Sequence, residues 1–327
     1  MDLELSDEQR WLREAVDELL EREPAERLWP ALLEFGALGE ELGLVERALV
    51  AHGLGAALAA VPYVDSAAAH YALDVLPEGA SAAVCIGEPA RTFAPTEPAT
   101  TLESGALVGD KAGVAFAASV DLLAISAADP DGLVIVLLPP AAAAAVEPET
   151  SLDPSLELAA VRLAGAEPTA VASADVELLA AAGGVLAAAE AVGSAARVLG
   201  LACEYAAQRR QFGRTIGSFQ AVRHLLADMH VKVESSWSSV LYAAASLDEA
   251  HDDRLRTASI AKAFSARATR EVAHDALQVF GGVAFTAEHP AHRYLRRIVA
   301  RGGQFGTAAE HERSLGRSLA RTPAGVT

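Results

Sequence analysis

One segment of the chain gathers residue types that suit an anionic ligand. Residues 208–220 read Gln-Arg-Arg-Gln-Phe-Gly-Arg-Thr-Ile-Gly-Ser-Phe-Gln. Arg209 supplies a permanent planar cation whose fork of donors matches a pair of pyrophosphate oxygens. Gln211 can add a further donor, and Phe212 can add an apolar wall. The segment therefore predicts a binding site for the phosphate part of a cofactor.

A second segment, residues 278–282, reads Gln-Val-Phe-Gly-Gly. Gln278 offers an amide to the adenosine or phosphate end of such a ligand. Gly281 and Gly282 remove side chains where a cofactor and the backbone must approach closely. A single arginine at a helix end is more often a solvated side chain, but two such segments in register favour a cofactor site.

Together, residues 208–220 and 278–282 resemble the flavin-binding signature of the acyl-CoA dehydrogenases. Residues 221–229 and 258–262 also fit the pattern of this family, so the resemblance covers nearly the whole chain. It implies FAD as the cofactor. In the family, these bundle residues bind the FAD that is held mainly by a neighbouring subunit, which predicts a cofactor shared at a subunit interface.

The resemblance also locates the catalytic base, and here the chain departs from the family. Removal of the proton alpha to a thioester requires a positioned carboxylate. The glutamate of the family lies in a Tyr-Glu-Gly-Thr segment, but residues 304–307 of this chain read Gln-Phe-Gly-Thr. Phe305 cannot accept a proton. A second branch of the family places the base at the position of Gly183, which is empty as well, so we expect no catalytic residue in this chain.

Few other side chains could replace the missing base. Glu190, among alanine and valine in the first bundle helix, is either a desolvated base with a raised pKa or, more often for such a residue, a capped, paired or interface glutamate. His224 is expected to be a packed or surface histidine. Glu310 and Glu312 are expected to be solvated charges.

The middle of the chain has lost much of the surface that supports the flavin ring in the family. Residues 109–116 match the length of a strand whose family sequence is Gly-x-Lys-x-Trp-Ile-Thr-Asn, and Asp121 follows as in the family. However, Gly113 replaces the tryptophan and Ala115 the threonine. The family's Thr-Glu-Pro-x-x-Gly-Ser-Asp loop survives at best as residues 96–98. We expect the isoalloxazine-binding surface of this subunit to be weakened or absent.

Helical patterns dominate the first part of the sequence. Residues 6–9 form a capping box that begins a helix, and Pro24 ends it. Residues 31–44 and 45–60 continue with alanine- and leucine-rich helical patterns. We therefore predict a trimmed N-terminal helical domain over residues 1–78.

The remaining elements complete a fold of mixed class. Short β-favouring runs separated by Pro, Gly and Asp predict a β-barrel or sandwich domain over residues 79–175, with the alanine tract 141–145 as a loop or short helical turn. Four long helices are expected in residues 176–327, as a C-terminal bundle that carries the FAD-binding and oligomerisation motifs. This order of domains is the one that the family resemblance implies.

Composition excludes several classes of function. The net charge of −18 and pI near 4.9 argue against nucleic acid or an anionic membrane surface as a partner. Cys85 and Cys203 show no metal-ligand or disulfide spacing, so no metal site is expected. Residues 1–4 do not resemble a signal peptide, and residues 176–202 favour a buried helix over a membrane span, which predicts a cytoplasmic protein.

Three functional hypotheses follow. The first is the non-catalytic subunit of a heteromeric α2β2 acyl-CoA dehydrogenase, similar to actinobacterial enzymes that oxidise bulky CoA thioesters such as steroid side chains. A paralogous partner would supply the glutamate, and an electron-transfer flavoprotein would accept the electrons. The second is a self-sufficient homomeric flavoenzyme, with a displaced base or with chemistry like that of the hydroxylase branch. The third is a scaffold subunit without catalytic activity.

Overall fold

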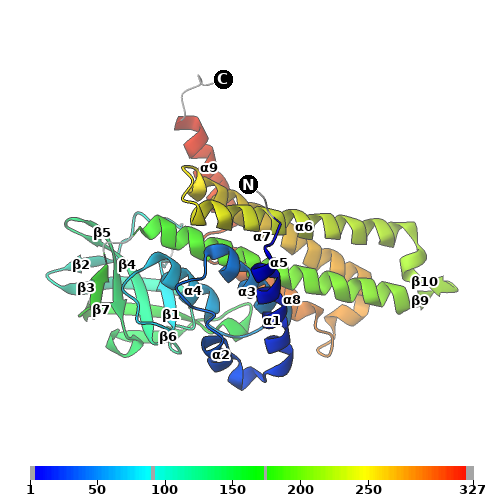
Figure 1. The fold of residues 1–327 in the computed structure, drawn as a ribbon, viewed down its shortest axis with the longest axis horizontal. Coiled ribbons are helices and arrows are strands. Elements are labelled where there is room, and N and C mark those ends of the chain that lie inside the picture. Colours follow the sequence, from blue (N-terminus) through cyan, green and yellow to red (C-terminus); the bar gives the residue numbers. More distant parts are fainter. Residues whose placement is uncertain (1–3, 90–92, 173–174, 322–327) are drawn as a thin grey trace.

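The computed structural model describes residues 4–89, 93–172 and 175–321. A bundle of long helices forms the body, a sheet lies at one end of it, and the N-terminal helices cover its middle (Figure 1). The predicted fold class, a helical region followed by a β region and a helical bundle, is confirmed. Residues 1–3 belong to the segment that does not resemble a signal peptide, and they lie outside the described residues.

Four helices make up the N-terminal region: α1 (Asp7–Arg22), α2 (Ala25–Glu34), α3 (Leu44–Ala57) and α4 (Tyr63–Ala72). The predicted capping box is present, because Ser6 Oγ accepts from the Gln9 amide and the Gln9 side chain accepts from the Ser6 amide. The expected helix over residues 31–44 is wrong in its second half. The helix ends at Glu34, since Gly36 adopts a φ of +81° and residues 35–43 form turns.

The β region forms one mixed sheet in the order β6-β7-β3-β2-β4-β5-β8, with β1 added in parallel beside β4. Most of its pairs are antiparallel. In the alanine tract, a short 3-10 helix, η1 (Pro140–Ala142), covers the start, as one of the two expected conformations, and strand β6 begins at Ala145. The strands are β1 (Ala82–Cys85), β2 (Thr101–Glu103), β3 (Ala106–Ala115), β4 (Leu122–Asp129), β5 (Gly132–Leu138), β6 (Ala145–Pro148), β7 (Leu158–Ala166) and β8 (Ala170–Ala172).

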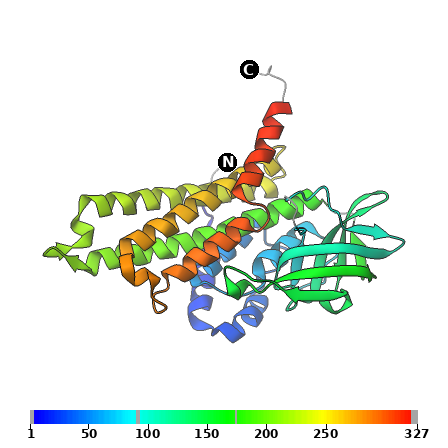
Figure 2. The ribbon, with the colours of Figure 1, turned by 180° about the vertical axis from the view of Figure 1, so that it is seen from behind.

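The bundle differs from the expected four long helices, because its last part is broken in two at residues 304–307. Figure 2 shows the second of these pieces, α9, projecting away from the body. A short hairpin, β9 (Arg210–Gln211) and β10 (Arg214–Thr215), joins the first two helices. The helices are α5 (Val176–Gln208), α6 (Gln220–Asp248), α7 (Arg254–Phe280), α8 (Ala291–Gly303) and α9 (Ala308–Arg321).

Helix α5 is the centre of the molecule. It is the one helix in the described residues that is long and apolar enough to cross a membrane, but 89% of its most apolar window is buried inside the protein, which makes it a core helix. Helix α3 crosses it very closely. A Cβ atom on Gly193 would stand 1.9 Å from the His52 carbonyl oxygen, and one on Gly55 would stand 1.9 Å from that of Glu190. Glycine at these two positions is what lets the helices touch.

Candidate active-site cavity and cofactor-binding segment

A cavity of about 520 Å³ lies between the sheet and the bundle. Strand β3, the loop after β6 and the turn between α8 and α9 form its walls. Most of its lining is apolar, with several carboxylates at the edge. The lining residues are Val84, Ile86, Gly87, Glu88, Phe93, Ala94, Glu97, Ala112, Gly113, Thr150, Ser151, Leu152, Leu156, Leu158, Val299, Ala300, Gly303, Gln304, Phe305, Gly306 and Glu310.

Phe305 stands in this cavity wall, 6% exposed, with its ring directed at α5. Ring atoms Cε1 and Cζ lie 2.4 Å from the point where a Cβ atom on Gly183 would be. The two positions at which the family resemblance predicts a base therefore lie against one another in the fold. A phenyl ring fills that point, and neither position carries a carboxylate.

The turn that carries Phe305 has a constrained backbone. Phe305 has a φ of +55° and Gly306 a φ of +95°, both in the left-handed region that favours glycine. A Cβ atom on Gly306 would lie 2.8 Å from both His311 Nε2 and Phe93 Cδ1. Both the backbone conformation and the lack of space for a Cβ atom therefore favour glycine at position 306. This agrees with the motif register that places Phe305 at the position of the family's glutamate.

Buried polar groups from two helices fasten this turn. The ammonium of Lys262 on α7 donates to the Arg301 carbonyl at 2.5 Å, and His311 on α9 donates to the Phe305 carbonyl at 2.9 Å. Burial and the neighbouring Arg301 cation lower the pKa of Lys262 to about 7. The aromatic side chain is therefore held in place from both ends of the turn.

A third anchor comes from the N-terminal region. Gln304 donates through Nε2 to Asp65 Oδ1 on α4 at 2.9 Å, and its Oε1 accepts from Arg301 Nη1. Asp65 is 2% exposed, and the backbone of Val84 and the Arg301 cation are the groups that favour its charged form. Burial raises the pKa of Asp65 to about 7, although Arg301 opposes the rise.

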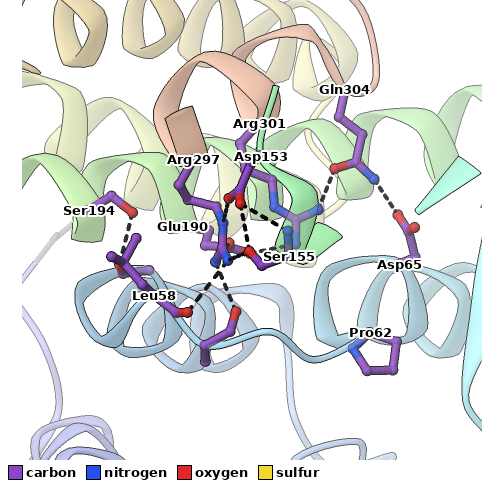
Figure 3. A network of polar contacts seen from close by, with 12 residues as sticks. Leu58, Pro62, Asp65, Asp153, Ser155, Glu190, Ser194, Arg297, Arg301 and Gln304 are labelled. Atoms are coloured by element: carbon purple, nitrogen blue, oxygen red, sulfur yellow. Dashed lines mark hydrogen bonds and ion pairs between the residues drawn. The ribbon is translucent and has the colours of Figure 1, made fainter. Parts of the chain in front are cut away.

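Glu190 lies in an ion-pair network behind the cavity wall (Figure 3). Arg297 donates to Glu190 Oε1 at 2.8 Å and to Asp153 Oδ2 at 2.6 Å, while Arg301 pairs with Glu190 Oε2 at 2.9 Å. Ser155 accepts another bond from Arg297. Both oxygens of Glu190 are occupied by guanidinium groups. Of the two alternatives that the sequence left open, the structure shows the paired glutamate.

The network joins all parts of the fold. Asp153 belongs to the loop that follows the β6 strand, Glu190 to α5, and Arg297 to α8, and Arg297 also donates to the Ala59 carbonyl after α3. The loop that carries Asp153 includes Thr150, Ser151 and Leu152 of the cavity wall. The network therefore fixes the cavity wall to the bundle and does not supply a base to the cavity.

Of the carboxylates that line the cavity, two accept hydrogen bonds from other groups and one is exposed at the rim. Glu88 pairs with Lys111 at 2.9 Å and accepts backbone amides; burial works against its charge, but these donors hold its pKa at about 2. Glu310 accepts from the amides of Phe93 and Thr307, which outweigh burial and lower its pKa. Glu97 is exposed at the rim. The first two are poor proton acceptors near neutral pH.

The wall at Gly113 does not fit an isoalloxazine ring. Among the described residues, no atom lies within 4 Å of the point where a Cβ on Gly113 would stand, so these residues do not fill the space of the tryptophan that the resemblance implies. The Gly113 amide already donates to Glu149 Oε2 at 2.7 Å. Residues 96–98 form a turn beside the cavity. The Glu149 carboxylate occupies the Gly113 amide, and no tryptophan stands at position 113. The described part of this surface is therefore unsuited to a flavin ring.

The predicted cofactor-binding residues gather at the other end of the bundle. Arg209 caps α5, Gln211 lies on β9, and Phe212 is 92% exposed at the tip of the hairpin with a φ of +53°. The rings of Tyr205 and Phe280, 5.4 Å apart, bring the end of α5 to the end of α7. The two sequence segments are thus neighbours in space.

The residues of the second segment are accessible at that place. Gln278 lies exposed in the last turn of α7, Gly281 caps the helix with a φ of +66°, and Gly282 has open space around it. The arginine, the amides and the glycines fit the phosphate and adenosine end of a dinucleotide. Figure 1 shows this hairpin at the end of the bundle opposite to the sheet.

Comparison with known proteins agrees with this geometry. The family described as "Acyl-CoA dehydrogenase, C-terminal domain" matches residues 181–320. The chain is 32% identical over 283 residues to acyl-CoA dehydrogenase IpdE2 of Mycolicibacterium smegmatis, an alignment that covers 86% of this chain and 80% of that protein. The chain belongs to the acyl-CoA dehydrogenase family. Membership supports an oxidoreductase activity and a flavin cofactor.

Other members of the family share the complete fold. Acyl-CoA dehydrogenase FadE27 of Mycobacterium tuberculosis is 30% identical, over 94% of this chain and 92% of its own length. A chain in the crystal structure of the ChsE4-ChsE5 complex from Mycobacterium tuberculosis superposes with a TM-score of 0.86, at 25% identity over 99% of this chain and 100% of that chain. Butyryl-CoA dehydrogenase from Megasphaera elsdenii, at 21% identity and a TM-score of 0.86, shares the fold.

Several features of this acyl-CoA dehydrogenase-family chain were not predicted from sequence. Glu149 gave no local signal for its bond to Gly113, because the two residues are 36 positions apart. Nothing in the sequence indicated that Arg297 and Arg301 on α8 are buried. His224, expected to be packed or on the surface, is exposed on α6 beside Gln220. Glu312, expected to be solvated, forms an exposed ion pair with Arg267.

Proposed function

We propose that this chain is the base-lacking subunit of a heteromeric, FAD-dependent acyl-CoA dehydrogenase. One observation carries the proposal: the Phe305 ring fills the space in which a side chain on Gly183 would begin, so neither position at which the resemblance predicts a base presents a carboxylate. Abstraction of the alpha proton then depends on a glutamate of a paralogous partner.

The separation of the two sites within the chain supports a shared cofactor. Gly183 lies against the Phe305 ring of the cavity wall, and Arg209 caps the same helix 26 residues later, which corresponds to about 39 Å along α5. This is longer than an extended flavin dinucleotide. An FAD bound by Arg209, Gln211 and Gln278 therefore has its ring outside this chain's own cavity, at the interface with the partner.

In such a complex the two subunits have different tasks. This chain supplies a permanent cation and amide donors to the pyrophosphate and adenosine of FAD, as the geometry of Arg209 and Gln278 allows. The partner supplies the flavin-ring surface and the glutamate that removes the alpha proton from the CoA thioester. We propose a bulky acyl group, such as a steroid side chain, as the substrate, and an electron-transfer flavoprotein as the acceptor.

Reconstitution with a paralogous subunit tests this function. The chain is produced alone, together with a paralogue that carries an intact Tyr-Glu-Gly-Thr segment, and together with the same paralogue after Glu-to-Gln substitution in that segment. We expect bound FAD in both complexes but not in the isolated chain, and dehydrogenase turnover only in the complex with the intact paralogue. Phe305→Leu in this chain serves as the matched control and should leave the kcat of that complex unchanged.

Two results would contradict the proposal. Stoichiometric FAD and turnover in the isolated chain would establish the self-sufficient flavoenzyme instead. If the paralogue alone has the same FAD content and turnover as its complex with this chain, the chain would have only the role of a scaffold. The cytoplasmic location remains a prediction from the sequence.

A further inference from the structure

Three aromatic side chains meet at the end of the bundle that carries Arg209. The ring of Tyr205 on α5 packs edge-on against that of Phe280 on α7, with the ring centroids 5.4 Å apart. The Phe280 ring also packs against His289, in the loop before α8, with the centroids 4.3 Å apart. His289 Nδ1 in turn accepts a hydrogen bond from the Ala291 amide at the start of α8. Phe280, which is 4% exposed, therefore joins three segments of the chain.

The contact of Tyr205 with Phe280 bears on the backbone of Arg209. The Arg209 amide donates to the Tyr205 carbonyl at 2.8 Å, and the Arg209 carbonyl accepts from the Ile216 amide at 2.8 Å. Both backbone groups of Arg209 are thus engaged, and the first of them is bound to the residue whose ring touches Phe280. The Arg209 side chain remains exposed. The position of this arginine relative to α7 therefore depends on the contact between the two rings.

Burial of Phe280 also directs Gln278. An α-helix has about 3.6 residues per turn, so side chains two positions apart point to nearly opposite sides. Phe280 is buried, and Gln278 is exposed on the other side of the same last turn of α7. Gly281 caps the helix directly after Phe280. Rotation or fraying of this turn would move the amide of Gln278 together with the ring.

We propose that Phe280 is a positioning residue for FAD, because its ring holds Arg209 and Gln278 at a fixed separation. The inference rests on the proposed function, in which both groups bind the phosphate and adenosine end of the cofactor. A ligand that bridges two helix ends binds more tightly when these ends are already fixed, since less conformational freedom is lost on binding. Phe280 acts through the two binding residues and not by its own contact with the cofactor.

FAD binding to the reconstituted complex tests the positioning. The dissociation constant is measured by flavin fluorescence for the complex of this chain with the intact paralogue. Phe280→Leu removes both ring contacts but keeps an apolar side chain, and it should weaken FAD binding by about 3- to 10-fold. Tyr205→Leu should have a similar effect, whereas Tyr205→Phe keeps the ring and should stay within about twofold of wild type. Phe264→Leu, the same substitution about 24 Å earlier on α7, is the matched control and should leave FAD binding unchanged.

A double-mutant cycle with Arg209→Ala distinguishes positioning from a general loss of stability. If the ring acts through the separation of Arg209 and Gln278, Phe280→Leu should weaken FAD binding by less than about twofold when residue 209 is already alanine. Equal weakening in both backgrounds would overturn the inference. So would Phe280→Leu and Tyr205→Leu complexes that bind FAD like the wild type while the Arg209→Ala complex does not.

Folding and the proposed function are checked separately. Thermal denaturation of each chain and sedimentation of each complex show whether it folds and assembles. Tyr205 is only partly buried, so the comparison of Tyr205→Leu with Tyr205→Phe decides the matter if Phe280→Leu does not fold. Equal weakening by these two variants would overturn positioning by the ring. An Arg209→Ala complex that binds FAD like the wild type would contradict the proposed function, and this inference with it.

Discussion

The ring of Phe305 occupies the space that a side chain on Gly183 would need: its Cε1 and Cζ atoms lie 2.4 Å from the position of a Cβ atom on that glycine. A side chain at position 183 and the Phe305 ring therefore exclude one another. Any side chain on Gly183 would meet the ring at its first atom. The two positions at which the resemblance predicts a base are therefore linked in the fold by one contact, that of the Phe305 ring with Gly183.

Substitution Gly183→Ala should destabilise the protein. The added methyl group must displace the Phe305 ring, which is fixed by the turn on both sides, and overpacking of this kind costs about 1–3 kcal/mol. Replacement of Phe305 by alanine in the same protein should remove the clash. Urea denaturation of both single variants and the double variant gives the coupling free energy, which we expect to favour the double variant by at least about 1 kcal/mol.

Gly200→Ala is the matched control for this measurement. It lies on the same helix with no atom within 4 Å of the added Cβ. Alanine is the better helix former, so this change should stabilise by up to about 1 kcal/mol. Equal effects of the two glycine substitutions, or independent effects of Gly183→Ala and Phe305→Ala, would show that the Phe305 ring does not occupy the space beside Gly183.

Substitution Glu190→Gln should lower the free energy of unfolding by about 3–5 kcal/mol. It removes the negative charge between Arg297 and Arg301, both about 1% exposed, and leaves two buried cations beside one another. Thermal or urea denaturation measures the loss. The reconstituted complex should keep its turnover per folded molecule, since Glu190 does not act as the base.

The exposed pair of Arg197 with Glu204, on the same helix at 3.9 Å, provides the control. Glu204→Gln should cost less than about 1 kcal/mol, because solvent screens exposed pairs. Turnover abolished in a fully stable Glu190→Gln complex would favour the displaced-base hypothesis instead.

Much of the fold could be predicted from sequence, because its signals are local. The capping box at Ser6 and the apolar runs of β1 and β5 are decided by neighbouring residues, and the structure has them. Residues 35–43 were harder. Their alanine and leucine content resembles a helix, but the backbone of Gly36 is left-handed, and this conformation is not visible in composition.

The candidate site divides in the same way. The motif register placed Phe305 and Gly183, and their contact in space follows from it. The polar network could not be predicted, because it brings together Asp65, Asp153, Glu190 and Arg297 from four distant segments. Only Glu190, among alanine and valine, has a sequence environment that suggests burial, and its arginine partners lie more than 100 positions away. Burial decides their role, and burial is a property of the packed fold.

The pH dependence of stability should depend on Asp65. Its pKa is raised to about 7 in the folded protein, so between its unfolded value near 3.8 and pH 7 the folded state binds more protons than the unfolded state. This contribution is fully present at low pH and is lost as the pH rises through 7, by an amount on the order of 4 kcal/mol. Asp65→Asn should abolish it while keeping an acceptor for Gln304.

The difference between wild type and Asp65→Asn isolates this group. Two other buried residues act in the opposite direction: burial lowers the pKa of His52 to about 4 and, with Arg301, that of Lys262 to about 7, so each adds stability as the pH rises. They are common to both proteins and cancel. Urea denaturation at pH 5 and pH 8 should show a variant that gains relative to wild type at the higher pH. A difference that stays constant would mean that Asp65 is not a buried acid.

Arg209 tests the cofactor-binding segment in the assembled complex. Hydrogen bonds to a charged partner contribute about 1.5–3 kcal/mol, so Arg209→Ala should weaken FAD binding by roughly 10- to 150-fold. Arg209→Lys should recover only part of this affinity, because a point charge cannot donate to two phosphate oxygens in a fork. Arg210→Ala is the control on the same hairpin, since Arg210 donates to the Gly213 carbonyl. FAD released during dilution is followed by its fluorescence. If Arg209→Ala retains FAD as tightly as Arg210→Ala, the phosphate end of the cofactor is bound elsewhere, and the shared-cofactor arrangement must be abandoned.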